Sequence, residues 1–301
     1  MNNMPVLKLL FIINPGSGAK STDWPALVKE KCTISQCSFE MFELPEHCGV
    51  EELIAKIKEY DPAKVIAVGG DGTVNLLAQC LLNTKIPLGI LPGGSANGMA
   101  KELSIPMDPD KALEVCLNGV SKNIHIININ DRFCIHLSDL GFNAYVTKKF
   151  KALKKRGIWG YIKAGWRIFW NQPMLRVNIQ MNEKEISRNA IMIVIANATK
   201  YGTGVVINPA GKLDDEVFEV IVVKRISFFQ SLKMLVTHNA FDTNKTEVFT
   251  SNAVQIYPNK KTHFQVDGEY LGKVNMVKAS IILNALQLIV PADTNEIKNN
   301  D

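Results

Sequence analysis

The sequence predicts a two-domain α/β protein, in which an N-terminal parallel α/β layer precedes an antiparallel β-sandwich or curled sheet. Strand-like and helix-like patterns alternate through the first 125 or so residues, and strand-like segments dominate from about Asn123 onward. A chain of 301 residues is also long enough for two hydrophobic cores. We therefore expect domains at residues 1–125 and 126–291, followed by a polar tail at 292–301.

The elements of the first domain follow from hydrophobic spacing. Val6–Ile13 is a nearly continuous apolar run, which is typical of a strand buried on both faces of a parallel sheet. Glu51–Tyr60 carries its apolar residues at helical spacing. The other elements expected here are the strands Val65–Val68 and Ile86–Leu91 and the helices Val74–Leu82, Ala96–Leu103 and Asp110–Leu117.

The second half is divided into strand-like segments by turn signals such as Asn182-Glu183 and Pro258-Asn259. Two helices are expected within it, at roughly Tyr145–Trp170 and Ser227–His238. The expected strands are Ile124–Ile129, Phe133–Leu140, Leu175–Met181, Ala190–Asn197, Val217–Val223, Val248–Ile256, His263–Val266 and Ser280–Val290.

The composition, with 47% hydrophobic and 21% charged residues, is that of an ordinary globular protein. No apolar run approaches the ~20 residues that span a bilayer. The first residues show no charged n-region and no cleavage site, so we expect no secretory signal. The six cysteines show no CxxC pair and no zinc spacing, so we expect free thiols in a reducing cytoplasm. The net charge of +5 permits an anionic ligand or membrane surface without requiring one, and we expect no nucleic-acid partner.

The most informative segment is the loop Gly69-Gly70-Asp71-Gly72-Thr73-Val74-Asn75, which directly follows the strand-like Val65–Val68. Glycine allows positive φ angles and has no Cβ, so this strand-to-helix corner lets a ligand approach the backbone. The usual ligand is phosphate, held by N–H groups at a helix N-terminus. Because Asp71 would face the phosphates, the loop predicts a nucleotide with a divalent cation. A turn that only reverses the chain is the alternative, and it explains the aspartate poorly.

Two further loops of small residues follow strand-like segments. The first, Asn14-Pro15-Gly16-Ser17-Gly18-Ala19-Lys20, offers free N–H groups and a lysine to a phosphate. It lacks the ending of a Walker A loop, and alone it is as consistent with a simple strand–turn–helix connection. The second is Pro92-Gly93-Gly94-Ser95-Ala96-Asn97-Gly98. Since adjacent parallel strands end at one sheet edge, we expect all three loops to lie side by side and to bind a ligand there.

Two acidic segments in the second half have alternative explanations. Asp267-Gly268 followed by Glu269 fits a hairpin turn, for which Asp-Gly is a favoured pair, or a general base that takes a proton from a hydroxyl. Lys212-Leu213-Asp214-Asp215-Glu216-Val217 fits a site for a hard cation or a solvated loop.

A third segment, Lys148–Trp170, combines basic residues with three of the chain's four tryptophans. That combination suits a helix lying on an anionic bilayer, which would place the protein at the periphery of the inner membrane face. A solvated basic face over a buried aromatic stripe is an equally good explanation.

Taken in order, these segments resemble the bacterial diacylglycerol kinase-like lipid kinases, the superfamily that also contains sphingosine and ceramide kinases. The resemblance extends from about Val6 to Pro291. Its markers are Asn-Pro-Gly-Ser-Gly at 14–18, Gly-Gly-Asp-Gly-Thr-Val-Asn at 69–75, Leu-Pro-Gly-Gly-Ser-Ala-Asn at 91–97, Gly-Phe-Asn-Ala at 141–144, the region 197–215 and Gln-Val-Asp-Gly-Glu at 265–269.

The resemblance implies ATP-dependent phosphorylation of a lipid hydroxyl in phospholipid metabolism. It also implies a three-layer α/β nucleotide-binding domain similar to NAD kinase and phosphofructokinase, covered by the β-rich domain. ATP would contact Asn14–Lys20, Gly69–Asn75, Gly94 and Ser95. Glu269 would accept the proton, and Asp71 would serve the Mg²⁺ carried by ATP. A second, structural Mg²⁺ would be held by Asp215 and the backbone oxygens of Lys212 and Val217.

Three positions depart from the family pattern. Bacterial diacylglycerol kinases usually have acids where this chain has Gly98 and His125, and those acids surround the magnesium-nucleotide. Glu216 replaces a common glycine, which bears on the structural metal. The sequence Gly-Ser-Ala-Asn-Gly at 94–98 is more similar to that of sphingosine kinases. The resemblance therefore does not decide whether the acceptor is diacylglycerol or a sphingoid lipid. A non-catalytic lipid or nucleotide sensor and a soluble-substrate kinase of the NAD kinase type are the alternatives, and the oligomeric state, including a homodimer, is open.

Overall fold

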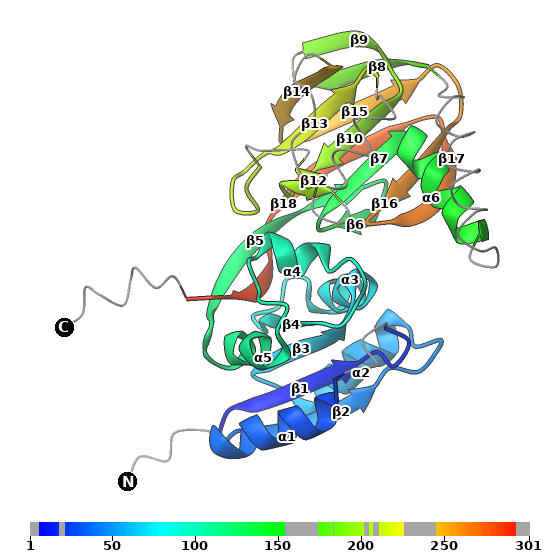
Figure 1. Cartoon of the computed structure of the whole chain (residues 1–301). Coiled ribbons are helices and arrows are strands. Elements are labelled where there is room, and N and C mark those ends of the chain that lie inside the picture. Colours follow the sequence, from blue (N-terminus) through cyan, green and yellow to red (C-terminus); the bar gives the residue numbers. More distant parts are fainter. Residues whose placement is uncertain are drawn as a thin grey trace. The chain divides into compact units, whose positions relative to one another are not determined.

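The computed structural model describes residues 6–17, 22–153, 174–182, 184–201, 205–206, 211–225 and 245–292. The chain forms two compact units, of which unit 1 comprises Met1–Ile124 with Asn284–Asp301 and unit 2 comprises His125–Leu283. This division differs from the expected domains at the C-terminal side, where residues after Leu283 return to unit 1. The reason is β18 (Val277–Val290), whose last part pairs with β4 (Leu88–Pro92) of unit 1 (Figure 1).

Unit 1 is built on a parallel sheet with the strand order β2-β1-β3-β4. The strands are β1 (Lys8–Ile13), β2 (Ser38–Glu43), β3 (Lys64–Gly69) and β4, and each neighbouring pair runs parallel. The apolar middles of β1, β3 and β4 are buried, as expected of strands covered on both faces. The sequence-based prediction of three neighbouring parallel strands is therefore confirmed.

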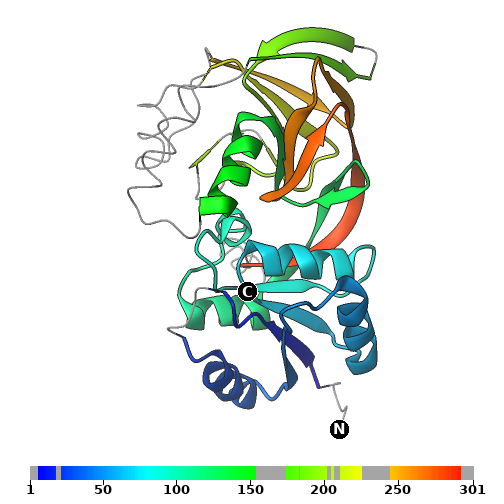
Figure 2. The same ribbon diagram turned by 90° about the vertical axis from the view of Figure 1, so that its right-hand side faces the viewer.

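Helices cover both faces of this sheet. The helices are α1 (Trp24–Ile34), α2 (Val50–Tyr60), α3 (Asp71–Leu81), α4 (Gly98–Glu102) and α5 (Pro109–Asn118). The chain moves one way along the sheet through α1 and the other way through α2 and α3, so right-handed crossovers place α1 opposite the other two (Figure 2). An ion pair between Lys31 and Asp110 (3.2 Å) joins α1 to α5. The three-layer α/β arrangement is thus confirmed.

The hydrophobic pattern does not predict α1 or β2. Helix α1 begins at the Asp23 N-cap, whose carboxylate accepts a hydrogen bond from Ala26 N (3.1 Å), and Pro25 occupies its first turn. Strand β2 lies at the sheet edge and has no fully buried residue, which leaves it without the apolar run that marks its neighbours.

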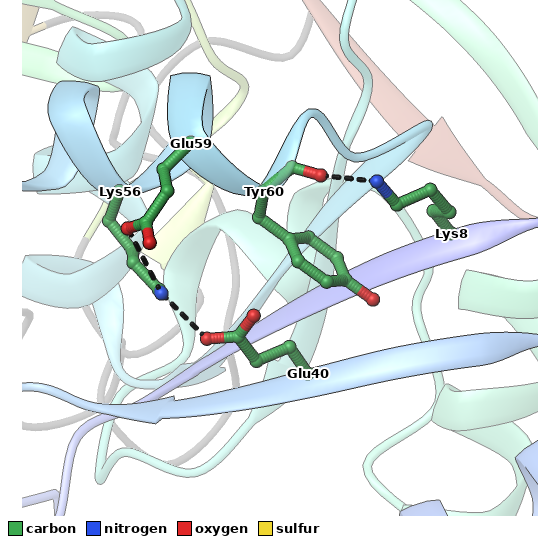
Figure 3. Close-up of polar contacts among 5 residues, drawn as sticks. All are labelled: Lys8, Glu40, Lys56, Glu59 and Tyr60. Atoms are coloured by element: carbon green, nitrogen blue, oxygen red, sulfur yellow. Dashed lines mark hydrogen bonds and ion pairs between the residues drawn. The ribbon is translucent and has the colours of Figure 1, made fainter.

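The end of α2 is fastened to the sheet by polar contacts (Figure 3). Lys56 Nζ lies 2.7 Å from a Glu40 carboxylate oxygen on β2 and 3.3 Å from Glu59 on its own helix. Lys8 Nζ on β1 donates a hydrogen bond to Tyr60 O (2.5 Å), the last residue of α2. These contacts join α2 to β1 and β2, while the burial of apolar side chains supplies most of the stability of the helix.

Unit 2 contains two facing antiparallel sheets and a short ribbon. The six-stranded sheet has the order β14 (Thr246–Ser251), β13 (Phe218–Val223), β10 (Met192–Ala196), β7 (Leu137–Gly141), β16 (Thr262–Val266) and β17 (Glu269–Val274). The facing strands are β5 (Val120–Ile129), β6 (Arg132–Cys134), β8 (Leu175–Met181), β9 (Lys184–Ala190), β15 (Ala253–Pro258) and β18. The ribbon pairs β11 (Lys200–Tyr201) with β12 (Val205–Val206).

The central strands β7, β10 and β13 of the six-stranded sheet are buried on both faces. Ile195 and Val220 belong to the core between the two sheets, whereas Val194 and Ile221 belong to a second cluster on the opposite face. Helix α6 (Phe142–Leu153) packs along β7 and β16 and contributes to this second cluster (Figure 1). The expected β-sandwich is confirmed, and its central strands read as continuous apolar runs because both faces are covered.

Two expected strands are each divided in the structure. Phe133–Leu140 forms β6 and β7. The strand is interrupted because the N–H groups of Ile135 and His136 donate to the Asp267 carboxylate and not to a neighbouring strand. Val248–Ile256 is interrupted at Asn252, where the chain passes from β14 in one sheet to β15 in the other. The pattern also does not predict β9 and β17, which are polar strands at sheet edges.

Of the expected helix at Tyr145–Trp170, α6 accounts for the part up to Leu153. The rest of that segment and the whole of the expected helix Ser227–His238 lie outside the described residues. Within the described part of the chain, no helix is both long enough and apolar enough to cross a bilayer.

Candidate functional site

Three loops meet at the carboxyl edge of the unit 1 sheet, as their spacing predicts. Asn14, which ends β1, donates a hydrogen bond through Nδ2 to Thr73 Oγ1 (2.9 Å) at the start of α3. Gly93 N, which follows β4, donates to Gly69 O (2.8 Å) at the end of β3. Direct contacts therefore hold the loops after β1, β3 and β4 side by side, at the edge where open α/β sheets bind ligands.

Some of the glycines are required by the contact between loops. A Cβ on Gly94 would lie 2.5 Å from Gly70 Cα, and a Cβ on Gly69 would lie 2.4 Å from Thr73 Oγ1. Real Cβ atoms do not approach other atoms so closely, and in the first case the neighbour is backbone that cannot turn aside. The absence of a side chain at Gly69 and Gly94 is therefore explained by packing within unit 1.

Gly72 has no such explanation. It is exposed in the first turn of α3, and a Cβ added there would meet nothing within 4 Å. Glycine costs roughly 1 kcal/mol relative to alanine inside a helix, so the protein's own packing gives no reason for it. A ligand that approaches the backbone of this turn would give one.

The exposed surface of the three loops consists of small residues around the N-terminus of α3, which exposes backbone N–H groups to a ligand. Gly16, Gly72 and Ser95 are exposed, one from each loop. The N-cap residue Gly70 has no side chain to bond the first N–H groups of α3. The N–H groups of Thr73 and Val74 donate to Gly70 O, which leaves those of Asp71 and Gly72 without a partner inside the helix. A helix N-terminus with uncovered N–H groups favours anions, so the site has the chemistry of a phosphate cradle.

Asp71 is the acidic group of this cradle. Its Oδ1 accepts a hydrogen bond from Met99 N (3.1 Å) in α4. Asn97 shapes the same loop, because its Oδ1 accepts from Gly94 N and its Nδ2 donates to Gly94 O (both 2.8 Å). One carboxylate oxygen of Asp71 thus connects two loops.

The remaining predicted residues of unit 1 differ in burial and in hydrogen bonding. The side chains of Thr73 and Val74 are buried, so any contact they make with a ligand comes from the backbone. Asn75 is half-buried and accepts a hydrogen bond from Gln79 Nε2 (2.7 Å). Pro15 is exposed, and Ser17 Oγ donates to Asn14 O (2.7 Å). Gly18, Ala19 and Lys20 lie outside the described residues.

In unit 2, Glu269 is exposed at the first position of β17. It follows a two-residue turn in which Asp267 and Gly268 have φ angles of 44° and 81°. Positive φ at both central positions is characteristic of a type I′ hairpin, so the Asp-Gly hairpin prediction is confirmed. The turn presents the Glu269 carboxylate to solvent at a sheet edge, and its role as a proton acceptor stays a prediction.

The Asp267 carboxylate clamps this turn to the chain before β7. It accepts hydrogen bonds from Ile135 N (2.9 Å), His136 N (3.0 Å) and Leu137 N (3.0 Å). Burial raises the pKa of the Asp267 carboxyl above its ordinary value, and the backbone donors oppose that rise. Burial likewise raises the pKa of the Cys134 thiol, which donates a hydrogen bond to Asp267 at 3.4 Å.

A second set of bonds holds the turn from the α6 side. Gly268 N donates to Gln265 Oε1 (2.6 Å), and Gln265 Nε2 donates to Asp139 Oδ2 (2.5 Å). Asn143 Nδ2 on α6 donates to the same oxygen of Asp139 (2.6 Å). The prediction from sequence missed the supporting roles of these residues, although Gln265 and Asn143 lie inside quoted motifs and Asp139 lies two positions before one. Together they fix Glu269 on a turn restrained from two sides.

The predicted metal residues lie in the turn before β13. Asp215 Oδ1 is buried and has no hydrogen-bond partner within the described part of the chain, while Lys212 is exposed and Val217 is half-buried. Burial raises the pKa of Asp215, and the nearby Asp214 charge raises it further. No group of three His, Cys, Asp or Glu side chains in the described part of the chain is arranged to hold a metal. The observation that fits a hard cation here is the buried Asp215 oxygen, because such cations bind single carboxylates together with neutral oxygens.

The basic segment proposed for membrane contact begins within the described residues. Lys148 Nζ on α6 lies 5.5 Å from the centre of the Tyr270 ring on β17. Tyr270 also shares a hydrogen bond of 2.7 Å with His263 Nδ1, and the His263 ring stacks against Tyr145 at 5.1 Å. Lys148 is thus engaged in an aromatic cluster of unit 2, and residues 154–173 of the segment lie outside the described part.

Two family models match the chain along most of its length. The diacylglycerol kinase catalytic domain matches residues 8–129, and the YegS C-terminal NAD kinase beta sandwich-like domain matches residues 138–290. The chain therefore belongs to the family of diacylglycerol kinase-like lipid kinases, and its N-terminal part is a kinase catalytic domain.

Individual proteins agree with this placement. The chain is 32% identical to "Probable lipid kinase YegS-like" of Chromohalobacter salexigens over 61% of either chain. It is 26% identical to a diacylglycerol kinase of Staphylococcus saprophyticus over 96% of either chain. A crystal structure of a diacylglycerol kinase from Bacillus anthracis shares the fold with a TM-score of 0.71 at 18% identity, covering 95% of this chain and 98% of the other. An ATP complex of an NAD kinase from Archaeoglobus fulgidus shares it with a TM-score of 0.56 at 12% identity, covering 98% and 97%.

Proposed function

We propose that this protein is an ATP-dependent lipid kinase that transfers the γ-phosphate of ATP to the hydroxyl group of diacylglycerol or a sphingoid-type lipid. The observation that carries this proposal is the cradle of unit 1, where three loops of small residues surround the N-terminus of α3 and Asp71. The family adds lipid as the acceptor class, since relatives are named diacylglycerol kinase or lipid kinase.

The cradle accounts for nucleotide binding. Backbone N–H groups around Gly16, Gly72 and Ser95 would hold the phosphates without side-chain interference. Mg²⁺ carried by ATP would neutralise phosphate charge when bound, and Asp71 is the residue here that would hold it. Because these donors are fixed before the ligand arrives, positioning and charge stabilisation supply most of the rate expected for phosphoryl transfer.

Glu269 would act on the acceptor. As the lipid hydroxyl oxygen forms a bond to the γ-phosphorus, the bond from that phosphorus to the β–γ bridging oxygen breaks and ADP leaves. The hydroxyl proton goes to the Glu269 carboxylate, which is exposed and therefore accessible to a substrate. The clamps at Asp267 and Gly268 would keep the carboxylate in position through this step.

A non-catalytic lipid or nucleotide sensor is the second candidate. It is favoured by Gly98 and His125, which stand where related enzymes place acids. Gly98 stands at the start of α4 and is buried. As a glycine it supplies no carboxylate that could assist Asp71. Peripheral binding to an anionic membrane and a homodimer are further proposals, which liposome co-sedimentation and light scattering would test.

The test is a panel assay with γ-³²P-labelled ATP and MgCl₂. Purified protein would be incubated with diacylglycerol, sphingosine, ceramide and NAD in separate mixed micelles or solutions, and the products separated by chromatography. We expect label in one lipid class. Label in NAD alone would identify a soluble-substrate kinase, and a thermal shift with MgATP but no labelled product would identify a sensor.

A further inference from the structure

A buried polar cluster in unit 2 contains side-chain oxygens that receive no hydrogen bond. Asn197, which directly follows β10, is only 1% exposed. Its Nδ2 donates to His125 O (2.8 Å) and to Ile135 O (3.2 Å), which fixes the orientation of the amide. Its Oδ1 is buried and has no partner among the residues that the structure describes. A buried acceptor without a hydrogen bond reduces the stability of the fold, so we expect a bound water or cation beside it.

His125 connects this amide to the acidic turn. Its N–H donates to Leu213 O (2.8 Å), and its carbonyl accepts from Asn197. In an extended strand the N–H and C=O of one residue point to the same side, so Leu213 and the Asn197 amide lie along the same edge of β5. Asp215 follows in the turn that begins at Leu213, two positions beyond the carbonyl that bonds His125 N.

Asp215 Oδ1 is the second buried acceptor without a partner. Two such oxygens on adjoining segments would be satisfied by a bound ligand that carries positive charge or hydrogen-bond donors. A carboxylate favours the cation, and hard divalent cations bind several oxygens at once, including amide carbonyls and water. The amide oxygen adds a ligand without adding the repulsion of a second carboxylate.

We propose that Asn197 Oδ1 supplies an oxygen to the divalent cation held by Asp215, directly or through one bound water. This extends the donor set beyond Asp215 and the backbone oxygens of Lys212 and Val217. The inference rests on the proposed function only in taking Mg²⁺ as the cation of this turn. Asn197 would then have two roles, since the same amide also bonds the backbone of His125 within β5 and of Ile135 just after β6.

The test measures metal binding without catalysis. Metal-stripped full-length protein would be titrated with MnCl₂ in the absence of ATP and lipid, with free Mn²⁺ followed by its EPR signal and Mg²⁺ added as competitor. We expect one site in the wild type. Asn197→Leu should weaken Mn²⁺ affinity by about 10- to 100-fold, the range seen when supporting metal-site residues are lost. Asp215→Asn should weaken it at least as much.

Two further variants separate a ligand from a structural clamp. Asn197→Asp loses the amide donor but keeps an oxygen and gains a charge, so it should bind Mn²⁺ at least as tightly as the wild type. Asn128→Leu is the matched control, because Asn128 Oδ1 in β5 is also buried without a partner and lies three positions beyond His125. It should bind Mn²⁺ normally.

Several outcomes would overturn the inference. These are wild-type protein that binds no Mn²⁺ without ATP, Asn197→Leu with wild-type affinity, or equal weakening in Asn197→Leu and Asn197→Asp. If Asn197→Leu does not fold, the Asn197→Asp and Asp215→Asn comparison still decides the matter. Since neither ATP nor lipid is present, a failure of the proposed kinase activity would leave this result unaffected.

Discussion

The Asp71 carboxylate accepts a hydrogen bond from the backbone N–H of Met99 at 3.1 Å, which ties the loop after β3 to the helix after β4. Helix α4 (Gly98–Glu102) needs this contact, because its own N-cap residue Asn97 is left-handed and makes no side-chain cap bond. The sequence suggests for Asp71 only a role with a cation. The structure adds a capping role, so substitutions at this position have two separable consequences.

Replacement of Asp71 by asparagine should separate those consequences. An amide oxygen can still accept from Met99 N, so the free energy of unfolding should change little, whereas Mg²⁺-dependent activity should fall sharply because the charge is lost. Asp71→Ala should lose the cap as well and unfold more easily by about 0.5–2 kcal/mol. Urea denaturation and the labelled-ATP assay would be run on both variants. Full activity in Asp71→Asn would show that the carboxylate does not serve a cation.

Gly94→Ala should destabilise unit 1. The new Cβ would lie 2.5 Å from Gly70 Cα, and backbone cannot yield without moving a loop. Overpacking of this kind costs roughly 1–3 kcal/mol, which a shift in the urea midpoint would reveal. An unchanged midpoint would mean that the two loops are not in contact as described.

Gly72→Ala should behave in the opposite way. Because a Cβ there meets nothing within 4 Å, the free energy of unfolding should stay equal or rise, by at most about 1 kcal/mol. Nucleotide affinity should nevertheless fall, since the methyl group would occupy the surface assigned to phosphate. Isothermal titration with MgATP would measure this, and an affinity equal to the wild type would remove Gly72 from the phosphate cradle.

Asp267→Asn should loosen the turn that carries Glu269. The amide can satisfy only part of the set of three backbone donors at 2.9–3.0 Å, and the charge that strengthens those bonds is lost. We expect a loss of about 1–3 kcal/mol in the free energy of unfolding together with reduced turnover. Asp131→Asn is the control, because Asp131 is exposed in the comparable Asn130-Asp131 turn and should have no effect on either measurement.

Glu247 should make part of the stability of unit 2 depend on pH. Hydrogen bonds from Lys224 and then Arg188 lower its pKa from the ordinary 4.5. A lowered folded-state pKa means that the contribution is present above about pH 4.5 and is lost as the pH falls through the lower folded value. Glu247→Gln should therefore be less stable than the wild type at neutral pH, and the difference should shrink in acid. A difference that stays constant from pH 7 to the acid limit of folding would contradict this assignment.

The sequence predicts the glycine-rich loops of unit 1 well, because each loop directly follows an apolar run that is recognisable as a buried strand. Gly69–Asn75 and Gly93–Asn97 follow apolar runs, so the order of parallel strands alone brings them to one edge, and the contacts between Asn14 and Thr73 confirm it. The edge strands β2, β9 and β17 lack that apolar signal, because one side of each is open and polar side chains are tolerated.

Other features depend on distant partners and cannot be deduced from local pattern. The break in Phe133–Leu140 comes from Asp267, more than a hundred positions along the chain. Strand β18 contributes to both units, because its first part pairs with β15 and its last part pairs with β4. The roles of Asp139 and Gln265 are likewise visible only once β7 and β16 are paired.

The central claim is that Glu269 takes the proton of a lipid hydroxyl as the γ-phosphate is transferred, and turnover of the Glu269→Gln variant tests it most directly. With the lipid identified by the panel assay, kcat should fall by about 10²–10⁴-fold while MgATP affinity and the unfolding midpoint stay near wild-type values. Glu185→Gln, at an exposed glutamate on the edge strand β9, should retain full activity. Near-normal turnover in Glu269→Gln would contradict the account.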